Sequence, residues 1–124
     1  MVLSLRIFYK FDPWHAQAPF YTRLYKQKAC DIIKDLHPKS VGDVGCGLGD
    51  IGRHLHDKHI IYKGFDIDLG AIKAARFLSK IFWNTNLSFF EGSFEECAKH
   101  DIEFVIMLNW LHGISPEKVI NILT

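Results

Sequence analysis

The 124-residue sequence lacks several features that would mark particular protein classes. Its three cysteines are an odd number at wide spacings without a CxxC pair, which argues against a disulfide framework and a zinc knuckle. Its apolar runs, such as residues 104–108, are far shorter than the roughly 18 residues that span a bilayer. Arg6, Lys10 and Asp12 interrupt the first apolar segment, so no signal peptide is expected. We therefore expect a cytoplasmic protein that does not bind membranes.

A large excess of charge of one sign is also missing. Fifteen Lys and Arg residues against fourteen Asp and Glu residues leave a formal net charge of +1, so no overall field attracts nucleic acid. Hydrophobic residues make up 48% of the chain, which is enough for one packed domain. We expect a single domain over residues 1–124, with an N-terminal arm at 1–20 and a helix plus a Rossmann-like part at 21–124.

Apolar periodicity predicts strands that alternate with helices. Strands are expected at 40–46, 60–66, 87–91 and 102–108. Helices are expected at 21–36, 50–57 and 69–82, with a short helical turn after Ser93 and a last helix from 115. The expected apolar positions of the first helix are Leu24, Tyr25, Ala29, Ile32, Ile33 and Leu36, and those of the helix at 69–82 are Ile72, Ala75, Phe77, Leu78 and Ile81. Strand–helix units of this length indicate an α/β fold with a parallel sheet.

A glycine-rich segment, VGDVGCGLGDIG at 41–52, joins the first strand to the next helix. Glycines at 45, 47 and 49 permit positive φ and remove Cβ atoms, so a ligand can approach the backbone at the carboxyl end of the strand. Residues 47–52 also match GxGxxG, and Asp66 lies at the distance typical of a ribose-binding carboxylate. Taken alone, this pattern favours a dinucleotide and an NAD(P)-dependent oxidoreductase.

Charge favours a different ligand. Asp43 just before the glycines and Asp50 at the helix start would both repel a pyrophosphate. They would attract a ligand with positive charge at its non-nucleoside end, such as an ammonium next to a sulfonium. S-adenosylmethionine has this charge pattern together with a ribose for Asp66.

At this point the motifs resemble a known family. DVGCGLG at 43–49 is similar to the first motif of class I S-adenosylmethionine-dependent methyltransferases, and GFDID at 64–68 resembles the end of their second strand. The segments at 89–94 and 104–112 are similar to the third and fourth strands, in the correct order. The resemblance implies a Rossmann-like parallel sheet of about four strands in the order 3-2-1-4, truncated relative to the seven-stranded family fold.

The resemblance also implies roles for individual residues in binding S-adenosylmethionine. The residues expected beneath the methionine part are Gly45, Cys46, Gly47 and Gly49, with Asp43 at its ammonium. Asp66 is expected to bind the ribose, Ile67 the adenine face, and Ser93 and Phe94 the adenine edge. Many members have Asp where Ser93 stands. Asn109 is expected beside the methyl-donor end.

Acceptor chemistry is less determined. His112, just beyond the fourth strand, is the candidate general base, while the spacing of His54, His56 and His59 does not suit a metal site. The near-neutral net charge favours a small-molecule acceptor over nucleic acid. A non-catalytic cofactor-binding module is the other alternative. The fourth strand is expected at an exposed edge, which a homodimer or another partner would cover.

Overall fold

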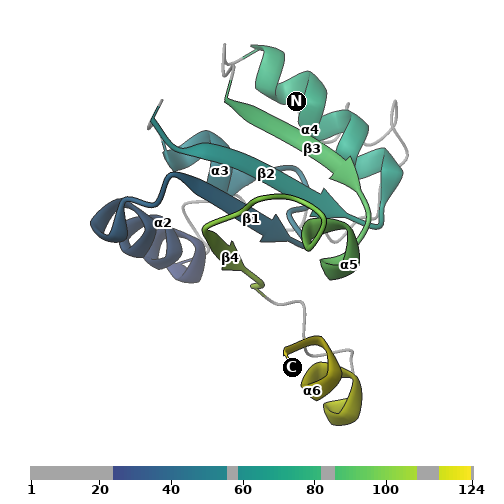
Figure 1. The fold of residues 1–124 in the computed structure, drawn as a ribbon. Coiled ribbons are helices and arrows are strands. Elements are labelled where there is room, and N and C mark those ends of the chain that lie inside the picture. The colour runs from purple at the N-terminus through teal and green to yellow at the C-terminus, as the bar shows by residue number, and fades with distance from the viewer. Residues whose placement is uncertain (1–23, 56–58, 82–85, 109–114, 124) are drawn as a thin grey trace.

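The sheet of this protein contains four parallel strands. The computed structural model describes residues 24–55, 59–81, 86–108 and 115–123. The strands are β1 (Ser40–Val44), β2 (Ile61–Asp66), β3 (Leu87–Glu91) and β4 (Phe104–Ile106). Their spatial order is β3-β2-β1-β4, and all three neighbouring pairs are parallel. The predicted α/β class and strand order are therefore confirmed (Figure 1).

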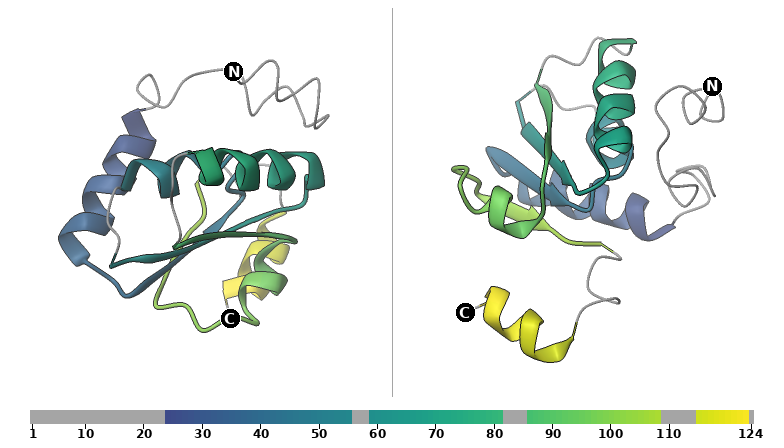
Figure 2. Two further views of the ribbon diagram at one scale, coloured as in Figure 1. Left: turned by 90° about the horizontal axis from the view of Figure 1, so that it is seen from above. Right: turned by 90° about the vertical axis from the view of Figure 1, so that its right-hand side faces the viewer.

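Helices lie on both faces of this sheet. They are α2 (Leu24–Leu36), α3 (Asp50–Leu55), α4 (Leu69–Ile81) and α5 (Phe94–Cys97). A further helix, α6 (Pro116–Leu123), follows β4 along the chain. Figure 2 shows α2, α3 and α4 on one face and the short α5 on the other. As the sequence predicts, helical connections join consecutive parallel strands.

Strand alternation decides which side chains each face receives. Val41 of β1 and Tyr62 of β2 point to the face under α2, α3 and α4, where the main core lies. Val44 and Phe65, one residue out of phase with these, belong to a smaller core beneath α5. Asp43 shares the phase of Val41, so the strand itself directs this carboxylate toward the helix-covered face.

β1 and β4 are shorter than predicted, because the turn of the glycine segment already starts at Gly45. Gly45 has a φ of 79°, and the N–H groups of Gly45 and Cys46 both donate to the carbonyl of Phe65 at 2.8 and 3.0 Å. This ends β1 at Val44 rather than at residue 46. Since β4 pairs only with residues 41–43 of β1, it spans Phe104–Ile106 instead of 102–108.

The predicted faces of two helices were wrong in part. In α2 only Ala29, Cys30 and Ile33 are buried, and in α4 the buried residues are Ala71, Ile72, Ala74, Ala75, Leu78 and Ser79. The expected core residues Leu24, Tyr25, Ile32, Leu36, Phe77 and Ile81 are exposed. The α2 helix packs beside α3 and buries only the narrow stripe formed by Ala29, Cys30 and Ile33, so its other apolar side chains remain outside. It ends at His37, whose φ is 48°, just before Pro38.

Within the part of the chain that the structure describes, no strand pairs with the outer edge of β4. The expectation that a partner covers this edge stays a prediction. None of the described helices is both long enough and apolar enough to cross a membrane.

Candidate functional site

The glycine segment forms a tight loop at the carboxyl end of β1. Gly45, Gly47 and Gly49 have φ values of 79°, 56° and 77°, so all three adopt the conformation for which glycine was expected. The loop closes through the N–H of Gly49, which donates to the carbonyl of Cys46 at 3.0 Å. Its turns leave the backbone of residues 45–48 facing a pocket.

Two glycines of this segment are also required by their neighbours. A Cβ atom at Gly49 would lie 2.5 Å from Cε1 of Phe89. A Cβ atom at Gly52 would lie 2.7 Å from Cδ1 of Tyr62. The last glycine of the GxGxxG pattern therefore allows α3 to pack closely on β2, and by itself says nothing about which ligand the loop binds.

Asp66 ends β2 and holds the loop in place. Its Oδ2 accepts the N–H of Gly47 at 2.8 Å, and its Oδ1 accepts the N–H of Asp68 at 2.9 Å. Each carboxylate oxygen keeps a second acceptor position, so these bonds leave capacity for ligand hydroxyl groups. Asp68 accepts the N–H of Ala71 at 3.2 Å and thereby caps α4, as expected.

Asp43 is a buried carboxylate without an ion-pair partner among the described residues. It is 3% exposed, and its Oδ2 accepts the O–H of Tyr62 at 2.5 Å. No ion pair to Asp43 occurs among the described residues, and its Oδ1 receives no hydrogen bond from them. Burial raises the pKa of Asp43 from 3.8 to about 6, while the Tyr62 hydrogen bond and Lys26 oppose the rise. Above pH 6 the described part of the site therefore contains a buried carboxylate charge that no direct ion pair offsets.

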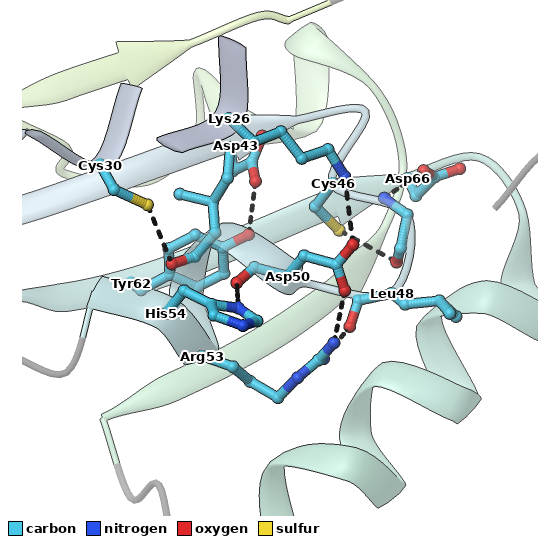
Figure 3. A network of polar contacts seen from close by, with 12 residues as sticks. Lys26, Cys30, Asp43, Cys46, Leu48, Asp50, Arg53, His54, Tyr62 and Asp66 are labelled. Carbon is cyan, nitrogen blue, oxygen red and sulfur yellow. Dashed lines mark hydrogen bonds and ion pairs between the residues drawn. The ribbon is translucent and has the colours of Figure 1, made fainter. Parts of the chain in front are cut away.

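Asp50 behaves differently from Asp43, which corrects one step of the sequence argument. Its carboxylate is 3.2 Å from Nζ of Lys26 and 2.5 Å from Nη2 of Arg53 (Figure 3). Arg53 also donates to the carbonyl of Leu48. Because two cations offset Asp50, it adds little to the repulsion of a phosphate, and that argument now depends on Asp43.

A pocket lies between the glycine loop, α2 and the start of α3. Its lining includes three charged side chains, Lys26, Asp43 and Asp50. Tyr25 and Leu108 add two large side chains from outside the loop. The remaining lining residues are Gly45, Cys46, Gly47, Leu48 and Ile51. The site thus places a buried carboxylate, Asp43, and a lysine ammonium in the lining of one pocket together with the backbone of the glycine loop.

Cys46 lies in this lining as a protonated thiol. Burial raises its pKa well above the usual value, and the charges of Asp43 and Asp66 raise it further. A thiol held in this form is a poor nucleophile, in keeping with its expected role as a small lining residue.

The residues expected around the adenine lie at the ends of β2 and β3. Ile67 directly follows Asp66 and is 77% exposed, so its apolar surface is open to a ligand. Ser93 precedes α5 without capping it through its side chain, so its hydroxyl is not used by the helix. Phe94 is half-buried against Val44 and Phe65. Asn109 and His112 lie outside the described residues, and their roles stay predictions.

Two side chains of the site, Lys26 and Tyr62, were missed by the sequence analysis. Lys26 stands one turn before Ala29 and Cys30 and two turns before Ile33, so it places a charge in line with the buried stripe of α2. Such a lysine within a buried stripe was the available signal. Tyr62 has the same phase as Asp66 on β2, but its approach to Asp43 depends on the register between two strands.

The chain is similar in sequence to a curated relative rather than to a family model. No protein-family model matches the chain. Over 94 residues, 76% of the chain, it is 30% identical to the 23S rRNA (uracil(747)-C(5))-methyltransferase RlmC of Shewanella oneidensis. The chain spans 23% of that relative's length.

Solved methyltransferase structures superpose on most of the chain. The small RNA methyltransferase HEN1 matches with a TM-score of 0.70 and 17% identity over 82% of this chain and 14% of HEN1. PKMT2 from Rickettsia typhi, in complex with AdoHcy, matches with a TM-score of 0.57 and 16% identity over 71% of this chain and 19% of PKMT2. With its sheet order and glycine loop, the chain therefore has the class I methyltransferase-like fold.

Proposed function

We propose that this chain is the cofactor-binding part of an S-adenosylmethionine-dependent methyltransferase whose acceptor is a small molecule. The observation that carries the proposal is Asp43, a buried carboxylate that forms no ion pair with any described residue and lines a pocket at the glycine loop. A buried charge of this kind is unfavourable unless a ligand of opposite charge offsets it. The pocket therefore suits a cationic ligand better than an anionic one.

The amino-acid end of S-adenosylmethionine supplies such a cation. Its ammonium would face Asp43, and its carboxylate would face the pocket side of Lys26. Lys26 already contacts Asp50 at 3.2 Å, so Asp50 would hold the ammonium of Lys26 in place. A zwitterion would thus meet two side chains of matching charge.

The nucleoside end would use the carboxyl edge of β2. Asp66 would accept both ribose hydroxyls on its remaining acceptor positions while it keeps the loop folded through Gly47. Ile67 offers exposed apolar surface for the adenine face, and the uncommitted hydroxyl of Ser93 lies at the start of α5. A dinucleotide would instead bring its pyrophosphate to the loop beside Asp43, which is why the oxidoreductase alternative is disfavoured.

When bound, the cofactor supplies an activated methyl group: the acceptor nucleophile bonds to the methyl carbon as the carbon–sulfur bond breaks and sulfur keeps the electron pair. The protein has little bond-making chemistry of its own to do, so its residues mainly orient the donor and exclude water. Asp43, Lys26 and Asp66 would fix the donor at three points, which aligns its methyl group with the acceptor.

Ligand titration tests the cofactor. We expect S-adenosylhomocysteine to raise the melting temperature of the chain and to bind in calorimetry, with NAD giving neither effect. Stabilisation by NAD alone would overturn the proposal. Binding of S-methylthioadenosine, which lacks the amino-acid part, measures the nucleoside half separately.

Transfer of a labelled methyl group tests the acceptor. The chain is incubated with labelled S-adenosylmethionine and separate pools of small metabolites, RNA and protein. Label in the metabolite pool is expected, on the ground of the near-neutral net charge. Since RlmC and HEN1 are named as RNA methyltransferases, the RNA pool is the informative rival. Label there would overturn the small-molecule acceptor and leave the cofactor proposal standing.

A further inference from the structure

Tyr62 is fully buried on β2, and it has no role in the sequence-based predictions or in the proposed function. It projects from β2 to the same face of the sheet as Asp43 on β1, and its hydroxyl donates to Oδ2 of Asp43 at 2.5 Å. Burial raises the pKa of Tyr62 well above its usual value, and the nearby charge of Asp43 raises it further. The phenol is therefore protonated at neutral pH and acts as the donor in this bond.

The ring of Tyr62 is held firmly on two sides. Gly52 of α3 lies so close above it that a Cβ atom there would be 2.7 Å from Cδ1. Phe89 of β3 packs edge-on against it, with 5.9 Å between the ring centroids. The ring that is packed on these two sides carries the hydroxyl that donates to Oδ2 of Asp43 (Figure 3).

The other groups around Asp43 do not neutralise it. Among the described cations, Lys26 acts on Asp43, but its ammonium contacts Asp50 at 3.2 Å. Asp50 and Asp66 carry the same sign as Asp43 and raise its pKa, while Lys26 lowers it. The described titratable groups that interact with Asp43 on its own face of the sheet are Lys26 and Cys30 on α2, Cys46 in the loop, Asp50 on α3, and Tyr62 and Asp66 on β2; Cys97 on α5 interacts with it from the other face.

Building on the proposed function, we infer that Tyr62 is a positioning residue of the cofactor site: it holds Asp43 with one oxygen toward the methionyl ammonium, and binding of that ammonium drives a proton off Asp43. The balance is simple. A protonated Asp43 gives its proton to solvent, and the resulting carboxylate pairs with the ligand ammonium. Above pH 6 most molecules are already ionised, because the pKa of Asp43 is about 6, so fewer protons leave.

Calorimetric titration of the full chain with S-adenosylhomocysteine between pH 5 and pH 7.5 tests this coupling. Affinity should be level near pH 7.5 and should fall by about tenfold per pH unit well below pH 6, as one linked proton requires. Titrations at pH 6 in two buffers of different ionisation enthalpy should show release of a fraction of a proton. S-methylthioadenosine, which has no ammonium, should bind without this pH dependence.

Two substitutions separate positioning from mere packing. Tyr62→Phe removes the bond that lowers the pKa of Asp43, so the fall in affinity should move to higher pH by about one unit. Asp43→Asn should abolish the pH dependence. Ser79→Ala is the matched control, because it removes another buried hydroxyl bond, 2.8 Å from the carbonyl of Arg76, away from the pocket.

The outcomes distinguish this inference from the function on which it rests. No binding of S-adenosylhomocysteine by the unmodified chain would overturn both. Binding without proton release near pH 6 would overturn only the coupling, even if Tyr62→Phe failed to fold. Equal loss of affinity at every pH in Tyr62→Phe would mean that the tyrosine only supports the structure, which would also overturn the positioning role.

Discussion

The backbone N–H of Gly47 donates to Oδ2 of Asp66 at 2.8 Å, so the end of β2 directly holds the glycine loop that follows β1. The same carboxylate accepts the N–H of Asp68 at 2.9 Å through its other oxygen. One side chain therefore joins the loop, the strand end and the start of α4. A ligand that bonds to Asp66 would be coupled to the shape of the loop.

Replacement of Asp66 should affect both the loop and the ligand. We expect Asp66→Ala to weaken binding of S-adenosylhomocysteine at least tenfold, and S-methylthioadenosine by a similar factor, because hydrogen bonds to a charged group contribute about 1.5 to 3 kcal/mol. Calorimetry with both ligands provides the measurement. Weakening of only one ligand would contradict the assignment of Asp66 to the ribose that they share.

Asp68→Ala is the matched control for this variant, two residues further along. Asp68 caps α4 by accepting the N–H of Ala71 at 3.2 Å, and it does not line the pocket. Its loss should lower the free energy of unfolding by about 1 kcal/mol and leave the affinity for both ligands within twofold. Denaturant unfolding and the same titrations check the two expectations.

Gly52→Ala should destabilise the protein through the ring of Tyr62. The added Cβ atom would lie 2.7 Å from Cδ1 and 2.8 Å from Cε1 of a side chain that has no room to retreat. Overpacking of this kind lowers the free energy of unfolding by roughly 1 to 3 kcal/mol. Gly70→Ala, in the first turn of α4 and without a positive φ, should be neutral or stabilising. Equal melting temperatures for the two variants would contradict the close packing.

The sequence was sufficient for the order of elements and for the loop. Alternation of apolar strands with helices predicts a parallel sheet. The glycines at 45, 47 and 49 predict a turn with positive φ angles, which glycine adopts most easily. It was insufficient for the faces of helices. Ile32 and Ile33 have the same hydropathy, yet only Ile33 is buried, because the neighbouring α3 covers a single stripe of α2.

The electrostatics of the site depended on contacts between distant residues. Asp43 and Asp50 look equivalent in the sequence, but Lys26, 24 positions before Asp50, forms an ion pair with Asp50 and acts on Asp43 only from a distance. Likewise the bond from Tyr62 to Asp43 needs the register that sets Asp43 opposite Gly64. Asp66 could be predicted because its position at a strand end follows from local pattern alone.

Asp43→Asn should make the unliganded protein more stable at neutral pH. The pKa of Asp43 is raised from 3.8 to about 6 in the folded state, so folding favours the protonated form. Its contribution to stability therefore falls as the pH rises from about 4 to about 6 and stays low above that, by roughly 3 kcal/mol in total. The asparagine avoids this loss, so the variant should gain stability relative to the unmodified chain over the same range.

Urea unfolding at pH 4.5 and pH 7.5 measures this difference. The two proteins should be similar at the lower pH and differ most at the higher one. The same variant should bind S-adenosylhomocysteine at least tenfold more weakly at pH 7.5, because it cannot pair with the ammonium. A variant less stable than the unmodified chain at pH 7.5 would show that the Asp43 charge is already offset without a ligand.

Lys26→Met keeps the length and apolar stem of the side chain and removes its charge. Lys26 lines the pocket beside the glycine loop and contacts Asp50 at 3.2 Å, so the variant loses the cation proposed to face the ligand carboxylate. We expect about tenfold weaker binding of S-adenosylhomocysteine and unchanged binding of S-methylthioadenosine, which has no carboxylate. Equal weakening of both ligands would mean that Lys26 acts by anchoring α3 through Asp50 rather than by contacting the amino-acid end.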